Sequence, residues 1–159
     1  MNTEQMQYAG FWVRMGATII DSLLELIIIV PLLILIYGWD YYTVERANFI
    51  AGPADFLISW VLPIVAVVWF WVKLQATPGK MAMSLKVVDA RTGNSLSVAQ
   101  AIGRYFAYFV STIPFGLGFI WIAFDSKKQG WHDKLAGTVV IRTHSGAPEP
   151  VRFEQPPAA

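Results

Sequence analysis

The sequence contains no cysteine and only two histidines, and 14% of its residues are charged. Without cysteine it can form neither a disulfide nor a thiolate metal site, and thiol catalysis is excluded. Neither histidine lies near a nucleophile motif and no zinc-ligand spacing is present, so we expect no catalytic site, no resident metal and no cofactor. The charged fraction is well below the quarter or so that is usual in soluble domains. The composition therefore predicts a non-enzymatic protein of the bilayer.

Long apolar runs are present instead. In residues 19–36, fourteen of eighteen positions are Leu, Ile or Val, a density typical of a membrane-spanning helix. A second run, residues 56–74, would be about 28 Å long as a helix, just enough to span the hydrocarbon core. A third apolar region covers residues 101–124. The sequence therefore predicts an all-α polytopic membrane protein with three to four hydrophobic helices and the lipid bilayer as its partner.

The third apolar region is interrupted by a helix-breaking segment, residues 114–118 (PFGLG). It is either a single broken span or two short helices that form a hairpin. We favour the hairpin, because it returns residues 138–142 to the side of residues 85–89. Both of these segments have strand character, and they can pair only on one side of the membrane. The sequence thus predicts a minor two-stranded β element at the cytoplasmic face.

Basic residues are concentrated after the second run, with five Lys or Arg against one acidic residue between positions 73 and 104. By the positive-inside rule this loop is cytoplasmic, which also places the N-terminus in the cytoplasm. Its charge suits anionic lipid, and we expect no nucleic-acid partner. We divide the chain into a polar N-terminal lead (1–10), a transmembrane domain (11–143) and a disordered, proline-rich C-terminal tail (144–159).

Four polar residues are set into the first apolar helix. Arg14, Thr18, Asp21 and Glu25 are spaced by four, three and four residues, so they share one stripe of the helix surface. A charge in hydrocarbon costs roughly 2.5–3.5 kcal/mol, so each needs a partner. Two interpretations stay open. Asp21 and Glu25 hold a cation or a proton, or Asp21 locks the helices together by pairing with Arg14 or Arg104.

The sequence resembles the RDD family of bacterial membrane proteins, which is named for one arginine and two aspartates. The matching segments are residues 8–14 (YAGFWVR) leading to Asp21, residues 77–80 (TPGK) with 85–89 (LKVVD), and residues 129–134 (QGWHDK) with 137–140 (GTVV). The resemblance maps Arg14 and Asp21 to the first two signature residues, and the third is Asp125 or Asp133. It implies a multi-pass protein of the bacterial cytoplasmic (inner) membrane.

Lys80, Asp125, His132 and Asp133 complete a candidate signature at the cytoplasmic face. His132 is either a pH sensor or gate, or part of an interfacial loop in which Asp133 caps or pairs with Lys134 and Trp131 anchors to the headgroups.

The resemblance implies transport of ligands that are not identified, and some relatives look like sodium/proton antiporters. We therefore expect transport coupled to cations or protons, with Na+ or H+ bound at the intramembrane cluster Arg14, Asp21, Glu25 and Arg104. Because so few helices enclose little pathway, we also expect a homo-oligomer. The alternative is a non-catalytic accessory or assembly subunit of another membrane complex.

Overall fold

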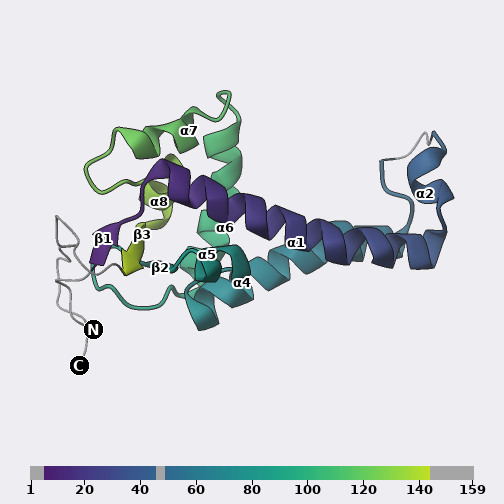
Figure 1. Cartoon of the computed structure of the whole chain (residues 1–159), viewed down its shortest axis with the longest axis horizontal. Coiled ribbons are helices and arrows are strands. Elements are labelled where there is room, and N and C mark those ends of the chain that lie inside the picture. Colours follow the sequence, from purple (N-terminus) through teal and green to yellow (C-terminus); the bar gives the residue numbers. More distant parts are fainter. Residues whose placement is uncertain (1–5, 46–48, 144–159) are drawn as a thin grey trace.

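The computed structural model describes residues 6–45 and 49–143, which form a mostly helical molecule with a small sheet at one end (Figure 1). Residues 1–5 of the expected lead and the expected disordered tail lie outside the described residues. The elements in chain order are β1 (Met6–Tyr8), α1 (Phe11–Tyr37), α2 (Asp40–Thr43), α3 (Pro53–Phe56), the π-helical turn η2 (Leu57–Val61), α4 (Leu62–Leu74), α5 (Pro78–Ala82), β2 (Leu85–Asp89), α6 (Val98–Thr112), α7 (Leu117–Ile120), η3 (Trp121–Ala123), α8 (Trp131–Ala136) and β3 (Thr138–Thr143).

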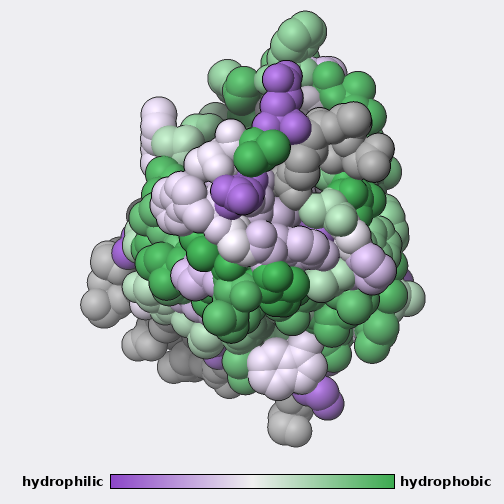
Figure 2. Space-filling model, turned by 90° about the vertical axis from the view of Figure 1, so that its right-hand side faces the viewer, coloured by the Kyte–Doolittle hydropathy of each residue, from purple (hydrophilic) through white to green (hydrophobic). Residues whose placement is uncertain are grey.

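Two helices are long and apolar enough to cross a membrane. They are α1, with 27 residues, and the continuous stretch Pro53–Leu74 formed by α3, η2 and α4, with 22 residues. Only 6% of the most apolar window of each is buried within the chain. Figure 2 looks onto the end that carries α2 and shows hydrophobic side chains around much of the outline. The outward Leu, Ile and Val side chains suit contact with acyl chains rather than with water.

The third apolar region is broken, as expected. α6 ends at Thr112, and the turn that follows holds Phe115 and Gly116 at φ values of 53° and 74°. The chain then continues through α7 and η3 at an angle of 109° to α6. The bent pair is a broken span or a re-entrant loop. The described residues therefore contain two membrane-capable helices, or three if the bent pair is one span, against the three to four that we expected.

The sheet has three antiparallel strands in the order β1-β3-β2. The predicted pairing between β2 and β3 is confirmed, with Leu85 opposite Arg142 and Asp89 opposite Thr138. The two-stranded prediction is wrong by one strand, because β1 adds to the free edge of β3 and places Met6 opposite Thr143. Residues 6–8 of the expected polar lead (1–10) therefore form a strand of the sheet. A three-residue strand is too short to show an alternating pattern.

The hydrophobic core lies where the sheet meets the ends of three helices. Ala17 of α1, Trp71 of α4 and Ala101 of α6 pack with Val87 of β2 and Val140 of β3, and all are at most 1% exposed. We call this part of the molecule, comprising the sheet, α5, α8 and the adjacent ends of α1, α4 and α6, the head. From it the more distant halves of α1 and α4 project toward α2 (Figure 1).

Candidate functional site

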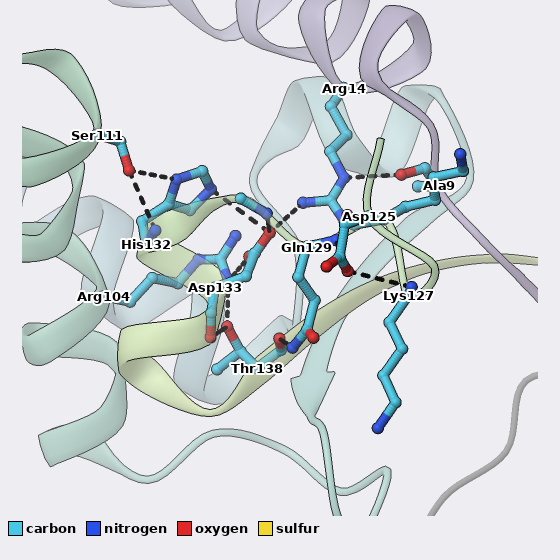
Figure 3. Close-up of polar contacts among 12 residues, drawn as sticks. Ala9, Arg14, Arg104, Ser111, Asp125, Lys127, Gln129, His132, Asp133 and Thr138 are labelled. Atoms are coloured by element: carbon cyan, nitrogen blue, oxygen red, sulfur yellow. Dashed lines mark hydrogen bonds and ion pairs between the residues drawn. The ribbon is translucent and has the colours of Figure 1, made fainter. Parts of the chain in front are cut away.

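The head contains a buried cluster of charges centred on Asp133 of α8 (Figure 3). Arg14 of α1 places its Nη1 2.5 Å from Oδ2 of Asp133. Arg104 of α6 forms an ion pair with the other carboxylate oxygen, Oδ1. The exposed fractions of the three residues are 0% for Asp133, 6% for Arg14 and 1% for Arg104. One carboxylate therefore joins three helices that are far apart in the sequence.

The two arginines also bind the backbone and the sheet. Arg14 donates from Nε to the carbonyl of Ala9 at 2.9 Å and from Nη2 to the carbonyl of Lys128 at 2.5 Å. Arg104 donates to the hydroxyl of Thr138, the first residue of β3. These contacts satisfy most of the donors that burial removes from water. We call Arg14, Arg104, Asp133 and Thr138 the arginine lock.

The charge state of the lock follows from its surroundings. Burial alone would raise the pKa of the Asp133 carboxyl, but Arg104 and Arg14 outweigh it and hold that pKa well below its usual range. A hydrogen bond from the backbone N–H of Gly130, 2.9 Å from Oδ2, acts in the same direction. Asp133 is therefore ionised, and the lock carries two positive charges and one negative charge.

His132 lies beside the lock and is neutral. Burial lowers the pKa of His132 to about 3, and the charges of Arg104 and Arg14 act in the same direction while Asp133 opposes them. Its Nδ1 lies 3.1 Å from the Ser111 hydroxyl, which also accepts a hydrogen bond from the His132 backbone N–H. The ring packs against Tyr108 and Phe119. Residues 131–136 form the helix α8 and not a loop, although Asp133 does cap it by accepting the Gly130 backbone N–H.

Asp125 lies outside the lock. It pairs with Lys134 at 2.5 Å and accepts the backbone N–H groups of Lys127 and Gln129 at 3.1 Å each. Lys134 therefore pairs with Asp125. The loop interpretation had offered Asp133 as the partner of Lys134, and that pairing is not present. Of the two candidate aspartates, the geometry groups Asp133 with Arg14.

Asp21 is held at a second place, against the short helix α5. The Thr77 hydroxyl donates to its Oδ2 at 2.5 Å, the Gly79 backbone N–H donates to its Oδ1 at 2.6 Å, and Lys80 Nζ lies 3.9 Å from Oδ2. A Cβ on Gly79 would come within 2.1 Å of the Ala17 carbonyl, so only glycine permits this approach of α5 to α1. The expected pairing of Asp21 with Arg14 or Arg104 is wrong, because both arginines bind Asp133.

Glu25 lies one turn further along α1 and lines a cavity of about 430 Å³. The cavity lies between α1, α4 and α6, and Asp21, Thr77 and Lys80 form part of its wall. The Glu25 side chain is exposed, and within the described residues it forms no ion pair or hydrogen bond. The polar stripe predicted on α1 is thus divided between the lock, the α5 contact and the cavity.

Several residues that complete these contacts were not predicted. Gln129 donates to the Thr138 carbonyl at 2.8 Å, and Thr138, Ser111 and Thr77 supply the hydroxyls described above. Small polar side chains are common in loops and helices, so their type carries little information. Their positions become meaningful only once the long-range packing is known.

Comparison with known proteins identifies the family of the chain. The model of the RDD family matches residues 8–137, which is most of the chain. The chain belongs to the RDD family. The matched region includes the three residues Arg14, Asp21 and Asp133, together with both apolar helices.

Three RDD relatives from Bacillus subtilis cover most of the chain. YxaI is 34% identical, over 84% of this chain and 96% of its own length, and YckC is 32% identical, over 89% of each. YteJ, which is named as a membrane protein, is 28% identical over 84% of this chain and 80% of its own length. No solved structure matches the chain. Together with the two apolar helices, this kinship indicates a membrane location.

Proposed function

We propose that this RDD protein is a small multi-pass protein of the bacterial cytoplasmic membrane that transports cations in exchange for protons or Na+. The observation that carries the proposal is the position of Glu25. Its carboxylate faces a cavity between membrane-capable helices and has no ion-pair partner among the described residues. Because an uncompensated charge at this depth is costly, a mobile cation or proton is the natural partner. We propose no catalytic role and no nucleic-acid partner.

The other charged residues are assigned to structure. Arg14, Arg104 and Asp133 satisfy one another at nearly full burial, so their role in the proposal is to hold α1, α6 and α8 together. Asp21 is already bound by Thr77, Gly79 and Lys80. Glu25 is therefore the proposed ion-binding residue, and the Asp21–Lys80 pair forms the cytoplasmic end of the cavity.

The proposed orientation places the head in the cytoplasm and at its interface. The last turn of α4 carries Lys73, and the segment between α4 and α6 carries Lys80, Lys86 and Arg91, which favours the cytoplasmic side. β1 belongs to the same sheet as β2, which supports the proposal that the N-terminus lies on the cytoplasmic side too. We further propose a homo-oligomer, because two or three helices leave the cavity open along its length.

The second candidate function is that of an accessory subunit. The observation that favours it is the arginine lock, because Arg14, Arg104 and Asp133 face one another and do not line the cavity. Such a protein would present its exposed apolar helices to a partner complex. It would carry no flux when it is reconstituted alone.

Reconstituted liposomes with a pH-sensitive dye inside test the proposal. The wild-type protein should acidify or alkalinise the lumen when a Na+ gradient is imposed, and Glu25→Gln should reduce the rate at least tenfold. Asp40→Asn is the matched control, since this exposed carboxylate lies on α2, far from the cavity. A wild-type rate equal to that of protein-free liposomes would exclude transport and favour the accessory function. Unchanged flux in Glu25→Gln would exclude Glu25 as the ion-binding residue.

A further inference from the structure

The cavity beside Glu25 combines one free carboxylate with walls that are mainly apolar and aromatic. Its aromatic lining consists of Phe70, Trp71, Tyr105, Tyr108 and Phe119. A carboxylate and aromatic faces together attract organic cations, through charge and through the electron-rich faces of the rings. The Tyr105 ring is close enough to Glu25 for the two to interact electrostatically. The cation in the lining, Lys80, is paired with Asp21 and so leaves the charge of Glu25 uncompensated.

The lining of this cavity offers too few oxygen ligands for an inorganic cation. Hard divalent cations bind about six or more oxygen ligands, and smaller ions also need several. Within the described residues there is no group of three or more His, Asp or Glu side chains that could hold a metal ion. Asp21 and Thr77 hydrogen-bond each other, which leaves Glu25 and Ser22 as the oxygen-bearing side chains of α1 that face the cavity without such a bond. A ligand that brings its own apolar surface fits better.

The cavity opens on a face that carries exposed apolar side chains. Leu24, Ile28 and Leu62 belong to its lining and are 39%, 55% and 44% exposed, although they lie on the two candidate spans. A ligand dissolved in the bilayer can therefore enter between α1 and α4. Trp71 also lines the cavity, and its indole Nε1 is buried without an acceptor among the described residues. An oxygen atom of a ligand would satisfy that donor.

We propose that this cavity binds an amphipathic organic cation, a quaternary or protonated amine or a phosphonium with apolar substituents, whose charge pairs with Glu25. The inference names the substrate class of the transport proposed above and rests on it for its biological meaning. Binding itself can be measured without flux. The volume of about 430 Å³ accommodates a molecule with several rings or a short alkyl chain, and not a whole phospholipid.

Calorimetry on the full chain in nanodiscs of zwitterionic lipid tests the inference with two probes of equal shape and opposite charge. Tetraphenylphosphonium should bind at one site per chain above the background of empty nanodiscs, and tetraphenylborate should bind at least tenfold more weakly. Glu25→Gln should weaken phosphonium binding at least tenfold. Ala66→Trp, which fills the cavity and leaves Glu25 in place, should do the same. Leu35→Trp is the control for the added indole, since Leu35 is 82% exposed and does not line the cavity.

The thermal midpoint of each variant shows that it is folded. Equal phosphonium affinity in wild type and Glu25→Gln, or equal affinity for the borate, would overturn the inference, because either result means partition into lipid or an apolar pocket without charge selection. Phosphonium binding that depends on Glu25, in a protein that produces no Na+-driven proton flux, would overturn exchange of Na+ for protons and support this site. Flux that depends on Glu25 without phosphonium binding would overturn the organic-cation inference alone.

Discussion

The arginine lock and the cavity both place charge in apolar surroundings, but they differ in how that charge is compensated. Asp133 is completely buried and lies between Arg14 and Arg104. Glu25 is exposed in the cavity and has no ion-pair partner among the described residues. Removing the charge of Asp133 leaves Arg14 and Arg104 without a counter-charge, whereas removing the charge of Glu25 removes the free-energy cost of an unpaired charge. The comparison teaches that the charge of Asp133 is paired within the fold, whereas the charge of Glu25 has no ion-pair partner among the described residues.

Asp133→Asn should lower the free energy of unfolding more than any other substitution proposed here. It leaves two buried arginines without a counter-charge, and breaking a buried ion pair from one side costs about 3–5 kcal/mol of unfolding free energy. Unfolding by sodium dodecyl sulfate in mixed micelles measures the loss. Asp125→Asn is the matched control, because its pair with the half-exposed Lys134 is worth about 0–1 kcal/mol. Glu25→Gln should change stability little or raise it. A loss for Glu25→Gln as large as that for Asp133→Asn would show that both charges are structural.

Gly79→Ala should loosen the contact between α5 and α1, which lies between the arginine lock and the Glu25 end of the cavity. The added Cβ would lie 2.1 Å from the Ala17 carbonyl and 2.9 Å from Cγ of Asp21, so α5 must move away and its hydrogen bonds to Asp21 weaken. We expect a loss of about 1–3 kcal/mol in the same assay. Gly103→Ala on α6 is the control, since a Cβ there meets nothing within 4 Å. Equal effects of the two substitutions would contradict the close approach at Gly79.

The smallest expected effect is the pH dependence of stability that His132 causes beside the arginine lock. The pKa of His132 falls from an ordinary value near 6.5 to about 3 in the folded protein, so the unfolded chain takes up a proton first as the pH falls. Stability contributed by neutral His132 is complete above about pH 6.5 and decreases below it, by at most about 1.4 kcal/mol per pH unit. The carboxyl of Asp133, whose pKa is lowered, adds its own loss only below about pH 4.

Thermal midpoints between pH 7 and pH 5 measure this slope. His132→Asn keeps a polar group near Ser111 but cannot take up a proton, so the variant should show a shallower decrease than the wild type. Identical slopes in the two proteins would mean that His132 is not the residue that responds.

Much of the architecture was predictable because it depends on local pattern. The apolar runs, the capping box of Ser97 and Gln100 that begins α6, and the pairing of Leu85–Asp89 with the strand at 138–142 follow from residue type and spacing. β1 was missed because three residues carry no readable period. The predicted cluster of Arg14, Asp21, Glu25 and Arg104 does not meet as one set. Arg14 and Arg104 meet at Asp133, whereas Asp21 contacts α5 and Glu25 lines the cavity.

The pairing of charges was the part that spacing could not predict. On one helix, Arg14, Asp21 and Glu25 share a stripe, which suggests that they act together. In the structure they have three different surroundings, because α8, α5 and the cavity each face a different turn of α1. Which carboxylate meets Arg14 depends on the bend after Thr112 and on the return of the chain through α8. These tertiary features cannot be predicted from the local sequence of residues 11–37.

The bond between Arg14 and Asp133 joins residues separated by 119 positions. At about 5–20 residues per second, the ribosome needs roughly 6–24 s to add the aspartate after the arginine has emerged. During that interval Arg14 has no Asp133 to pair with, and its guanidinium must remain hydrated. Burial of Arg14 therefore waits for α8, and α8 and β3 complete a fold that β1 and α1 begin.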